Sequence, residues 1–192
     1  MNKIYIYVEG KSDKEFVDCC LKHWGKLESF EVNINANSNV IQENLLNKIK
    51  SHKDRDEQVL IVFDADKDFI QTQERIIGES QGLMSAQEIF LFPNNQSNGE
   101  LETLLLEIAT NKKPCECFKR YIECLGNLKD NILKKSAIFA YREAMGAEKK
   151  IKGKNQEKEK IEILQTEFER IFDFESRVLN PLKQFIANYC KE

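Results

Sequence analysis

Long hydrophobic runs are missing from this sequence of 192 residues. Its longest apolar stretches have about five to six residues, whereas a membrane-spanning helix needs roughly 20. The apolar stretch near Met1 ends at Glu9, so it is too short and too soon charged for a typical signal peptide. We therefore expect a protein of the cytoplasm that has no membrane partner.

Cysteine pairs at the spacing of a zinc site are also missing. The cysteines form no CxxC pair, and His23 and His52 are the only imidazole groups. Structural zinc sites need four sulfur or nitrogen ligands at characteristic spacings, so a zinc protein is not expected. Without an export signal, the cysteines are expected to be reduced thiols, several of them in the core. The six are Cys19, Cys20, Cys115, Cys117, Cys124 and Cys190.

Neither sign of charge dominates the chain as a whole, because its net charge is -3. The distribution is nevertheless uneven. Residues 1–111 carry 11 Lys and Arg against 19 Asp and Glu, residues 112–154 carry 12 against 5, and residues 155–192 carry 6 against 8. An acidic part beside a basic part suits a polyanionic substrate held by a metal ion. Lysines that only solvate exposed helix faces give the same distribution.

Strand and helix patterns alternate over the first part of the chain. Short β-rich or uniformly apolar runs predict strands at residues 3–8, 30–34, 59–63 and 88–92. Apolar residues at helical spacing predict helices after Ser12, at residues 40–49, at 69–77 and at 100–110. Ser12, with Glu15 three residues later, has the pattern of a capping box. Such alternation predicts an α/β fold of Rossmann type, with a mainly parallel four-stranded sheet flanked by helices.

Only helix patterns follow residue 110. They lie at residues 114–125, 129–145, 158–172 and 181–189, and a lysine-rich stretch with two glycines at 146–157 is expected to be a loop. We therefore expect two parts: an α/β domain over residues 1–110, and a helical extension over residues 111–192 that packs on or beside it.

Acidic residues cluster where two of the expected strands end. The cluster Glu9-Gly10-Lys11-Ser12-Asp13 follows the first strand, and Asp64-Ala65-Asp66-Lys67-Asp68 follows the third. Open α/β sheets bind ligands at the carboxyl ends of their strands. Crowded carboxylates repel one another unless a cation offsets their charge, and hard oxygen ligands suit Mg²⁺ or Mn²⁺. The clusters therefore predict a site for one of these ions.

Three familiar motifs do not fit these clusters. A P-loop needs a glycine at the position of Tyr5, inside the first strand. A calcium-binding EF-hand loop starting at Asp64 needs glycine and glutamate where Phe69 and Arg75 stand. A receiver domain needs its acidic pair after the first strand and its phosphoacceptor after the third, whereas here the pair Asp64 and Asp66 follows the third.

The order of the two clusters resembles that of the Toprim domain, which is shared by topoisomerases, bacterial primases, small nucleases and the overcoming-lysogenization-defect (OLD) nucleases. The resemblance covers roughly residues 1–110 and is carried by Val8-Glu9-Gly10-Lys11-Ser12-Asp13 and by Phe63-Asp64-Ala65-Asp66-Lys67-Asp68. It is nearest to the OLD-type domains and to small uncharacterised bacterial Toprim-like proteins with a helical tail. Gly99-Glu100-Leu101-Glu102 and Phe172-Asp173-Phe174 are similar to segments of those proteins.

By this resemblance, Glu9, Asp64 and Asp66 form the catalytic core. Glu9 would be a metal ligand or a general acid and base, and Asp64 and Asp66 would hold the metal ion, with Mg²⁺ or Mn²⁺ as the cofactor. Hydrolysis would use a metal-activated water, because no tyrosine is linked by motif to the cluster.

Further carboxylates could complete a two-metal site. Asp13 matches a second acidic position of the OLD-type first motif, and Asp68 with Glu100 or Glu102 could join it. Favourable placement at the start of a helix explains Asp68, Glu100 and Glu102 equally well.

Lysines could contact a nucleic-acid backbone. Lys11 could bind a phosphate, and Lys150 and Lys152 belong to a basic stretch at residues 149–154 that could clamp the backbone. A lysine that only neutralises nearby carboxylates, and a solvated loop, are the alternatives for these positions. The basic stretch has no aromatic residues for base stacking.

Metal-dependent cleavage of nucleic acid is therefore the leading functional prediction, with a metal-dependent nuclease as the enzyme class. A non-catalytic module that binds nucleic acid or an ATPase partner is the main alternative, and a small-nucleotide phosphohydrolase would use the same ligands. Topoisomerases have a glutamate-glycine pair after their aspartates, where Asp68-Phe69 stands here, so strand passage is not expected. The chain lacks the ATPase of the OLD nucleases, so any ATP coupling would need a separate ATPase partner.

Overall fold

The computed structural model of the chain describes residues 3–36, 38–126, 135–147 and 157–190, with the backbone alone at 157–160. Several predicted features fall outside these ranges: most of the loop at 146–157, the first part of the helix at 129–145, and both Lys150 and Lys152. No helix in the described ranges is long and apolar enough to cross a membrane.

Four parallel strands form the sheet, in the order β2-β1-β3-β4. They are β1 (Ile4–Val8), β2 (Phe30–Ile34), β3 (Val59–Asp64) and β4 (Ile89–Phe92). At the end of β1, Val8 is level with Ile34 on one side and with Val62 on the other, so β1 and β2 finish together and β3 continues two residues further, to Asp64. The prediction of an α/β fold with a parallel four-stranded sheet is confirmed.

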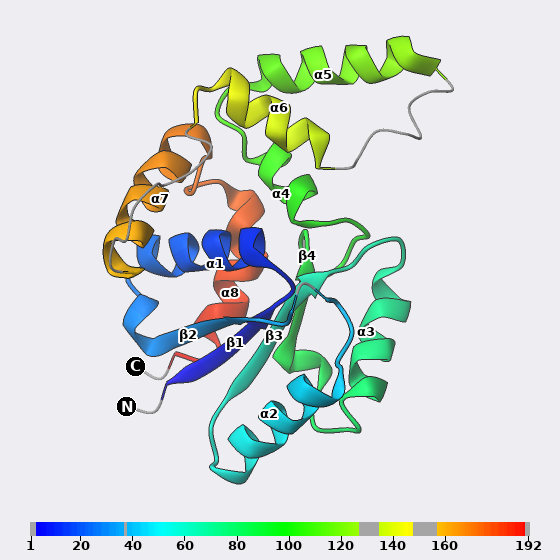
Figure 1. Cartoon of the computed structure of the whole chain (residues 1–192), viewed down its shortest axis with the longest axis vertical. Helices are drawn as coiled ribbons and strands as arrows, with labels where there is room; N and C mark the ends of the chain where they lie inside the picture. The colour runs from blue at the N-terminus through cyan, green and yellow to red at the C-terminus, as the bar shows by residue number, and fades with distance from the viewer. Residues whose placement is uncertain (1–2, 37, 127–134, 148–156, 191–192) are drawn as a thin grey trace.

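Helices cover both faces of the sheet (Figure 1). One face carries α1 (Lys11–His23), α7 (Glu157–Ile171) and α8 (Asn180–Ala187), and the other carries α2 (Glu43–Asp54) and α3 (Phe69–Glu79). Side chains alternate between the faces, as strand geometry requires. Val8 and Val62 join the core under α1, whereas Tyr7 and Ile61 join the core under α2 and α3. This is why β3 is uniformly apolar.

Three further helices lie beyond the carboxyl ends of the strands. They are α4 (Leu101–Glu107), α5 (Lys112–Leu125) and α6 (Ser136–Ala144), which Figure 1 shows above the end of the sheet where β1 and β3 finish. Leu101 and Leu104 of α4 and Tyr141 of α6 are buried in the same core as α1. None of the side chains of α5 is buried. The remaining short elements are 3-10 turns: η1 (Leu27–Ser29), η2 (Ala86–Glu88) and η4 (Arg177–Leu179).

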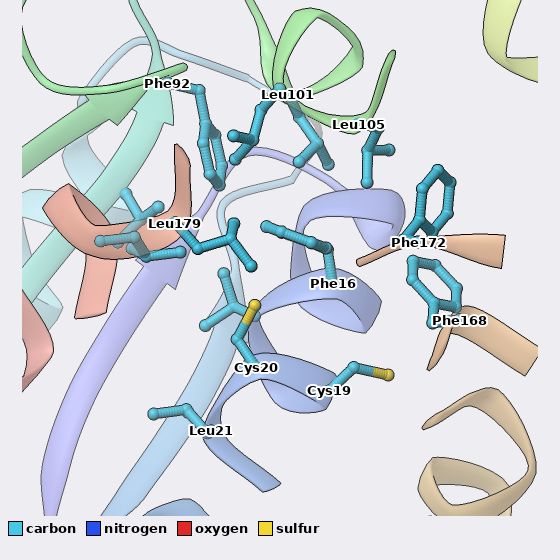
Figure 2. Packing of buried hydrophobic residues seen from close by; sticks show 14 of the residues in the cluster. Phe16, Cys19, Cys20, Leu21, Phe92, Leu101, Leu105, Phe168, Phe172 and Leu179 are labelled. Carbon is cyan, nitrogen blue, oxygen red and sulfur yellow. The ribbon is translucent and has the colours of Figure 1, made fainter. Parts of the chain in front are cut away.

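Phe16 of α1 lies where the sheet and the helical extension meet. Its ring centroid is 6.0 Å from that of Phe92 on β4 and 6.0 Å from that of Phe174 near the C-terminus. Figure 2 shows it surrounded by Phe92, Leu101 and Leu179. The extension therefore shares one hydrophobic core with the sheet, and the boundary at residue 110 stays a prediction.

Helices α1 and α2 begin at other residues than the sequence predicts, each because of identifiable hydrogen bonds. The capping box at Ser12 is wrong: Gly10 is the N-cap of α1, and the Asp13 carboxylate accepts a hydrogen bond from the Gly10 amide (3.0 Å). Helix α2 begins at Glu43 and not near residue 40, because the Asn35 side-chain amide donates to the Val40 carbonyl (2.9 Å) and the Ile41 amide donates to Glu79 (2.8 Å). These bonds to side chains hold the segment out of the helix.

Candidate functional site

The strand order creates a topological switch point between β1 and β3. The connection from β1 leads to β2 on one side, while β3 and β4 lie on the other side. Crossover connections diverge at such a point and leave a crevice at the carboxyl ends of the strands, which is where open α/β sheets bind ligands. Glu9 directly follows β1, and Asp64 is the last residue of β3. The two predicted carboxylates therefore flank the switch point.

Backbone amides fix both carboxylates. Glu9 Oε1 accepts a hydrogen bond from the Asp64 amide (2.8 Å), and Asp64 Oδ1 accepts one from the Leu101 amide (2.8 Å) at the start of α4. This chain of bonds links the ends of β1, β3 and the segment after β4. In the part of the chain that the structure describes, these are the only hydrogen bonds to the two carboxylates. One oxygen of each carboxylate is left for a ligand.

Asp66 is held by its own backbone and by a side chain that the sequence analysis did not single out. Its φ is +55°, and it pairs with Gly99 through two backbone hydrogen bonds of 2.9 and 2.8 Å. The Asn39 side-chain amide donates to Asp66 Oδ2 (2.9 Å). Gly99 has a φ of +142°, and a Cβ there would lie 3.0 Å from Pro93 Cδ. Glycine is therefore required for the approach of this loop to Asp66.

Asp13 and Glu102 add two buried carboxylates to the cluster. Asp13, on the first turn of α1, is 6% exposed, and Glu102, on the first turn of α4, is 7% exposed. Glu102 Oε1 lies 3.3 Å from Lys135 Nζ, at the start of α6. Lys135 was not predicted, because nothing in its local sequence distinguishes it from the other lysines of the basic segment.

The pKa values of the central carboxyls are raised. Burial is the largest cause for Glu9, whose pKa rises to about 7, and the charges of Asp13 and Asp66 add to the shift. Burial also leads for Asp64, whose pKa rises to about 8, followed by the charges of Glu9 and Asp13. Burial raises the pKa of Asp13 as well. Burial and mutual repulsion thus disfavour the ionised forms of these carboxyls, and a cation at the switch point would favour them.

Stability of the metal-free protein is expected to fall as the pH rises from about 4 to about 8. The folded protein keeps protons on Glu9 and Asp64 up to pKa values of about 7 and about 8, whereas the unfolded chain releases them near 4.5 and 3.8. The folded state therefore binds more protons in this window, so the free energy of unfolding decreases with pH. At about 1.36 kcal/mol per pKa unit, the two shifts set an upper limit of about 9 kcal/mol, and we expect a smaller fall because the two carboxyls share their repulsion.

Urea unfolding in a chelating buffer at pH 5, 7 and 9 measures this fall, and Glu9→Gln should make the profile flatter. The pKa of His23 is also raised, through hydrogen bonds to Glu169 and Glu175 that outweigh its burial, and this gives a fall of the same sign. That contribution persists in the Glu9→Gln variant. A variant profile as steep as that of the natural chain would contradict the prediction.

Other predicted site residues are not gathered into the cluster. Asp68 is exposed and is the N-cap of α3, where its side chain accepts a hydrogen bond from the Gln71 amide (3.0 Å). Glu100 is the N-cap of α4. Lys11 is 70% exposed and lies 3.6 Å from Glu15. Lys150 and Lys152 are outside the described residues, so their predicted role is not placed.

An open groove of about 1120 Å³ adjoins the cluster between α4 and α5. Asp66 and Glu102 line one part of it, and Lys112 and Lys119 of α5 line another. Lys112 also donates hydrogen bonds to the carbonyls of Leu106 and Glu107, which end α4 (2.9 and 2.6 Å). The groove therefore places two lysines of α5 and two carboxylates of the cluster, Asp66 and Glu102, in one concave surface.

The chemistry of the cluster fits a hard divalent cation. Its donors are all carboxylate oxygens, the ligands that Mg²⁺ and Mn²⁺ prefer, and a cation there would relieve the burial and mutual repulsion of their charges. Among the described residues, however, no three acidic, histidine or cysteine side chains are already arranged as a metal centre. The carboxylates are instead held individually by Asn39, Lys135 and backbone amides, so binding would require side-chain movement.

Comparison with known proteins places the chain in a family. No curated protein and no solved structure matches it. A family model described as "Protein of unknown function (DUF3226)" matches residues 3–191, which is nearly the whole sequence. The chain therefore belongs to the DUF3226 family.

Proposed function

We propose that the protein is a metal-dependent nuclease of Toprim type, which hydrolyses phosphodiester bonds in nucleic acid with Mg²⁺ or Mn²⁺. The observation that supports this most is the Glu9–Asp64 pair at the switch point between β1 and β3, where both carboxyls have raised pKa values. Such perturbed groups at the carboxyl ends of neighbouring parallel strands favour a functional site over an ordinary surface cluster.

The residues that would hold the ion are Glu9, Asp64 and Asp66. When bound, the ion would supply Lewis-acid stabilisation of the negative charge on the phosphodiester. The backbone amides of Asp64 and Leu101 orient the first two carboxylates, and Asn39 orients the third. This second layer of hydrogen bonds fixes ligand direction, as it does at other metal sites.

Nucleic acid is the proposed substrate because lysines share the groove with the carboxylates. Lys112 and Lys119 can attract a phosphate backbone to the wall formed by α5, next to Asp66 and Glu102. Lys150 and Lys152 stay a prediction for the same backbone, as does Lys11. The two kinds of charge thus have different tasks in the proposed reaction: the lysines bind the phosphates of the substrate, and the acidic cluster binds the metal ion.

Purified protein incubated with Mn²⁺ and with single-stranded DNA, duplex DNA, RNA or nucleoside triphosphates tests the proposal. We expect endonucleolytic or exonucleolytic products from at least one polymer, and none after chelation. Hydrolysis of nucleotides alone would favour a small-nucleotide phosphohydrolase. Binding of a polymer without cleavage, by protein that also binds Mn²⁺ weakly or not at all, would favour the non-catalytic module.

The cellular setting belongs to the same proposal. All six cysteines are free thiols, and Cys19 and Cys20 are buried in the core. Free thiols are typical of a reducing compartment, so we propose the cytoplasm. Any ATP coupling would come from a separate ATPase partner.

A further inference from the structure

Among the described residues, Lys135 is the cation that pairs with a buried carboxylate of the cluster. Its ammonium nitrogen lies 3.3 Å from Glu102 Oε1, and the Glu102 side chain is 9% exposed whereas that of Lys135 is 55% exposed. Burying a carboxylate is costly unless an opposite charge accompanies it. The lysine therefore neutralises Glu102 from the solvent side of the cluster.

The influence of this lysine extends past Glu102. The charge of Lys135 holds the pKa values of Glu9 and Asp13 below the level that burial alone would set. Burial lowers the pKa of Lys135 itself, but the nearby charges of Glu102, Asp13 and Asp64 outweigh burial and raise it. Two carboxylates of the cluster therefore have partners of different charge. Asp66 accepts a hydrogen bond from the uncharged Asn39 side chain, whereas Glu102 pairs with the ammonium group of Lys135.

A cation bound by Glu102 would compete with this ammonium group. A divalent ion there would have to displace Lys135 and then lie close to its positive charge, and both steps cost free energy in a partly buried site. Among the described residues, the side chain that holds Asp66 is the uncharged Asn39, so an ion at Asp66 would displace no cation there. Asp66 and Glu102 therefore differ in their capacity for a metal ion.

We propose that the ammonium group of Lys135 takes the place of a second divalent ion, so that the site binds a single Mg²⁺ or Mn²⁺ at Glu9, Asp64 and Asp66. This inference rests on the proposed function and replaces the two-metal arrangement that the acidic residues alone suggest. It also gives α6 a role in the site, since Lys135 is the N-cap of this helix and lies beside the cluster.

Counting bound ions tests the proposal without any measurement of activity. Calorimetric titration with Mn²⁺ at pH 8, together with electron paramagnetic resonance of bound Mn²⁺, should give one ion for the natural chain. Lys135→Gln should bind two, with spin coupling between the ions. Lys11→Gln is the matched control: Lys11 pairs with Glu15 and not with the cluster, so this variant should bind one ion. Adding Glu102→Gln to Lys135→Gln should restore a count of one.

The possible results separate this inference from the proposed function. Two ions in the natural chain, or one ion in a folded Lys135→Gln variant, would overturn the role of Lys135 and leave the metal-dependent function standing. No bound ion in the natural chain would overturn the metal site and the inference together. If Lys135→Gln does not fold, a count of two in the natural chain still overturns the inference, because the inference requires that count to be one.

Discussion

Replacing Asp64 with asparagine is expected to abolish metal-dependent cleavage and, at the same time, to make the metal-free protein more stable at alkaline pH. Asp64 Oδ1 accepts a hydrogen bond from the Leu101 backbone amide, and the side-chain oxygen of asparagine can accept the same bond. The local structure should therefore persist. The ion loses a charged ligand, and cleavage should fall at least about 100-fold, since even partners of metal ligands contribute 10–100-fold at other sites.

The gain in stability follows from the raised pKa of Asp64, about 8, which burial and the charge of Glu9 produce. At pH 9 this carboxylate is ionised and unfavourable in the folded state, so removing its charge should add about 3 kcal/mol. For a chain of this size, that corresponds to a rise in Tm of roughly 6–12 °C. At pH 4 the carboxyl is protonated in the folded protein, and the difference should shrink. Thermal unfolding in a chelating buffer at the two pH values measures both.

Asp68→Asn is the matched control for this experiment. The residue type is the same and lies four positions further along, but Asp68 is exposed and caps α3, a task that asparagine performs equally well. This variant should keep its cleavage activity and its Tm. Unchanged cleavage in Asp64→Asn would remove the assignment of the site, whereas a lower Tm at pH 9 would show that the carboxylate is stabilised by a partner and not repelled by its neighbours.

The strands could be predicted from the sequence because burial on both faces dictates their composition. β3 is buried throughout its apolar part, and only apolar, mostly β-branched residues satisfy such a position. Helix starts were harder to predict. They depend on single hydrogen bonds, such as the one from the Gly10 amide to Asp13, which moves the start of α1 two residues ahead of the expected cap at Ser12.

The same distinction explains the site. Glu9, Asp64 and Asp66 follow strand ends that a parallel sheet brings together, so topology alone gathers them. Asn39 and Lys135 reach the cluster from a loop and from a helix in the extension, and their positions depend on tertiary packing. The local sequence around Asn39 and Lys135 therefore shows no motif that would indicate their role. These partners of the carboxylates could be found only in the structure.

Truncating Phe16 to alanine should destabilise the whole chain by about 3–5 kcal/mol, the usual cost of removing a fully buried aromatic ring. Phe16 is completely buried and touches both the sheet, through Phe92, and the C-terminal segment, through Phe174. A cavity there therefore weakens the sheet and the helical extension together. Chemical unfolding followed by far-ultraviolet circular dichroism and by tryptophan fluorescence from Trp24 should show one shared transition, shifted to lower denaturant.

Phe139→Ala provides the comparison, because this phenylalanine of α6 is 61% exposed and its loss should change stability by no more than about 0.5 kcal/mol. Phe16→Leu keeps most of the buried volume and should give an intermediate loss of stability, so a folded variant is available if the alanine variant does not accumulate.

The decisive result concerns the cooperativity of unfolding. If residues 1–110 and 111–192 were separate domains that merely touch, the natural chain would unfold in two steps and Phe16→Ala would shift only the step that includes α1. A single step that moves as a unit means instead that α1 needs the C-terminal segment to complete its core, and that residues 1–110 expressed alone would expose the apolar surface around Phe16.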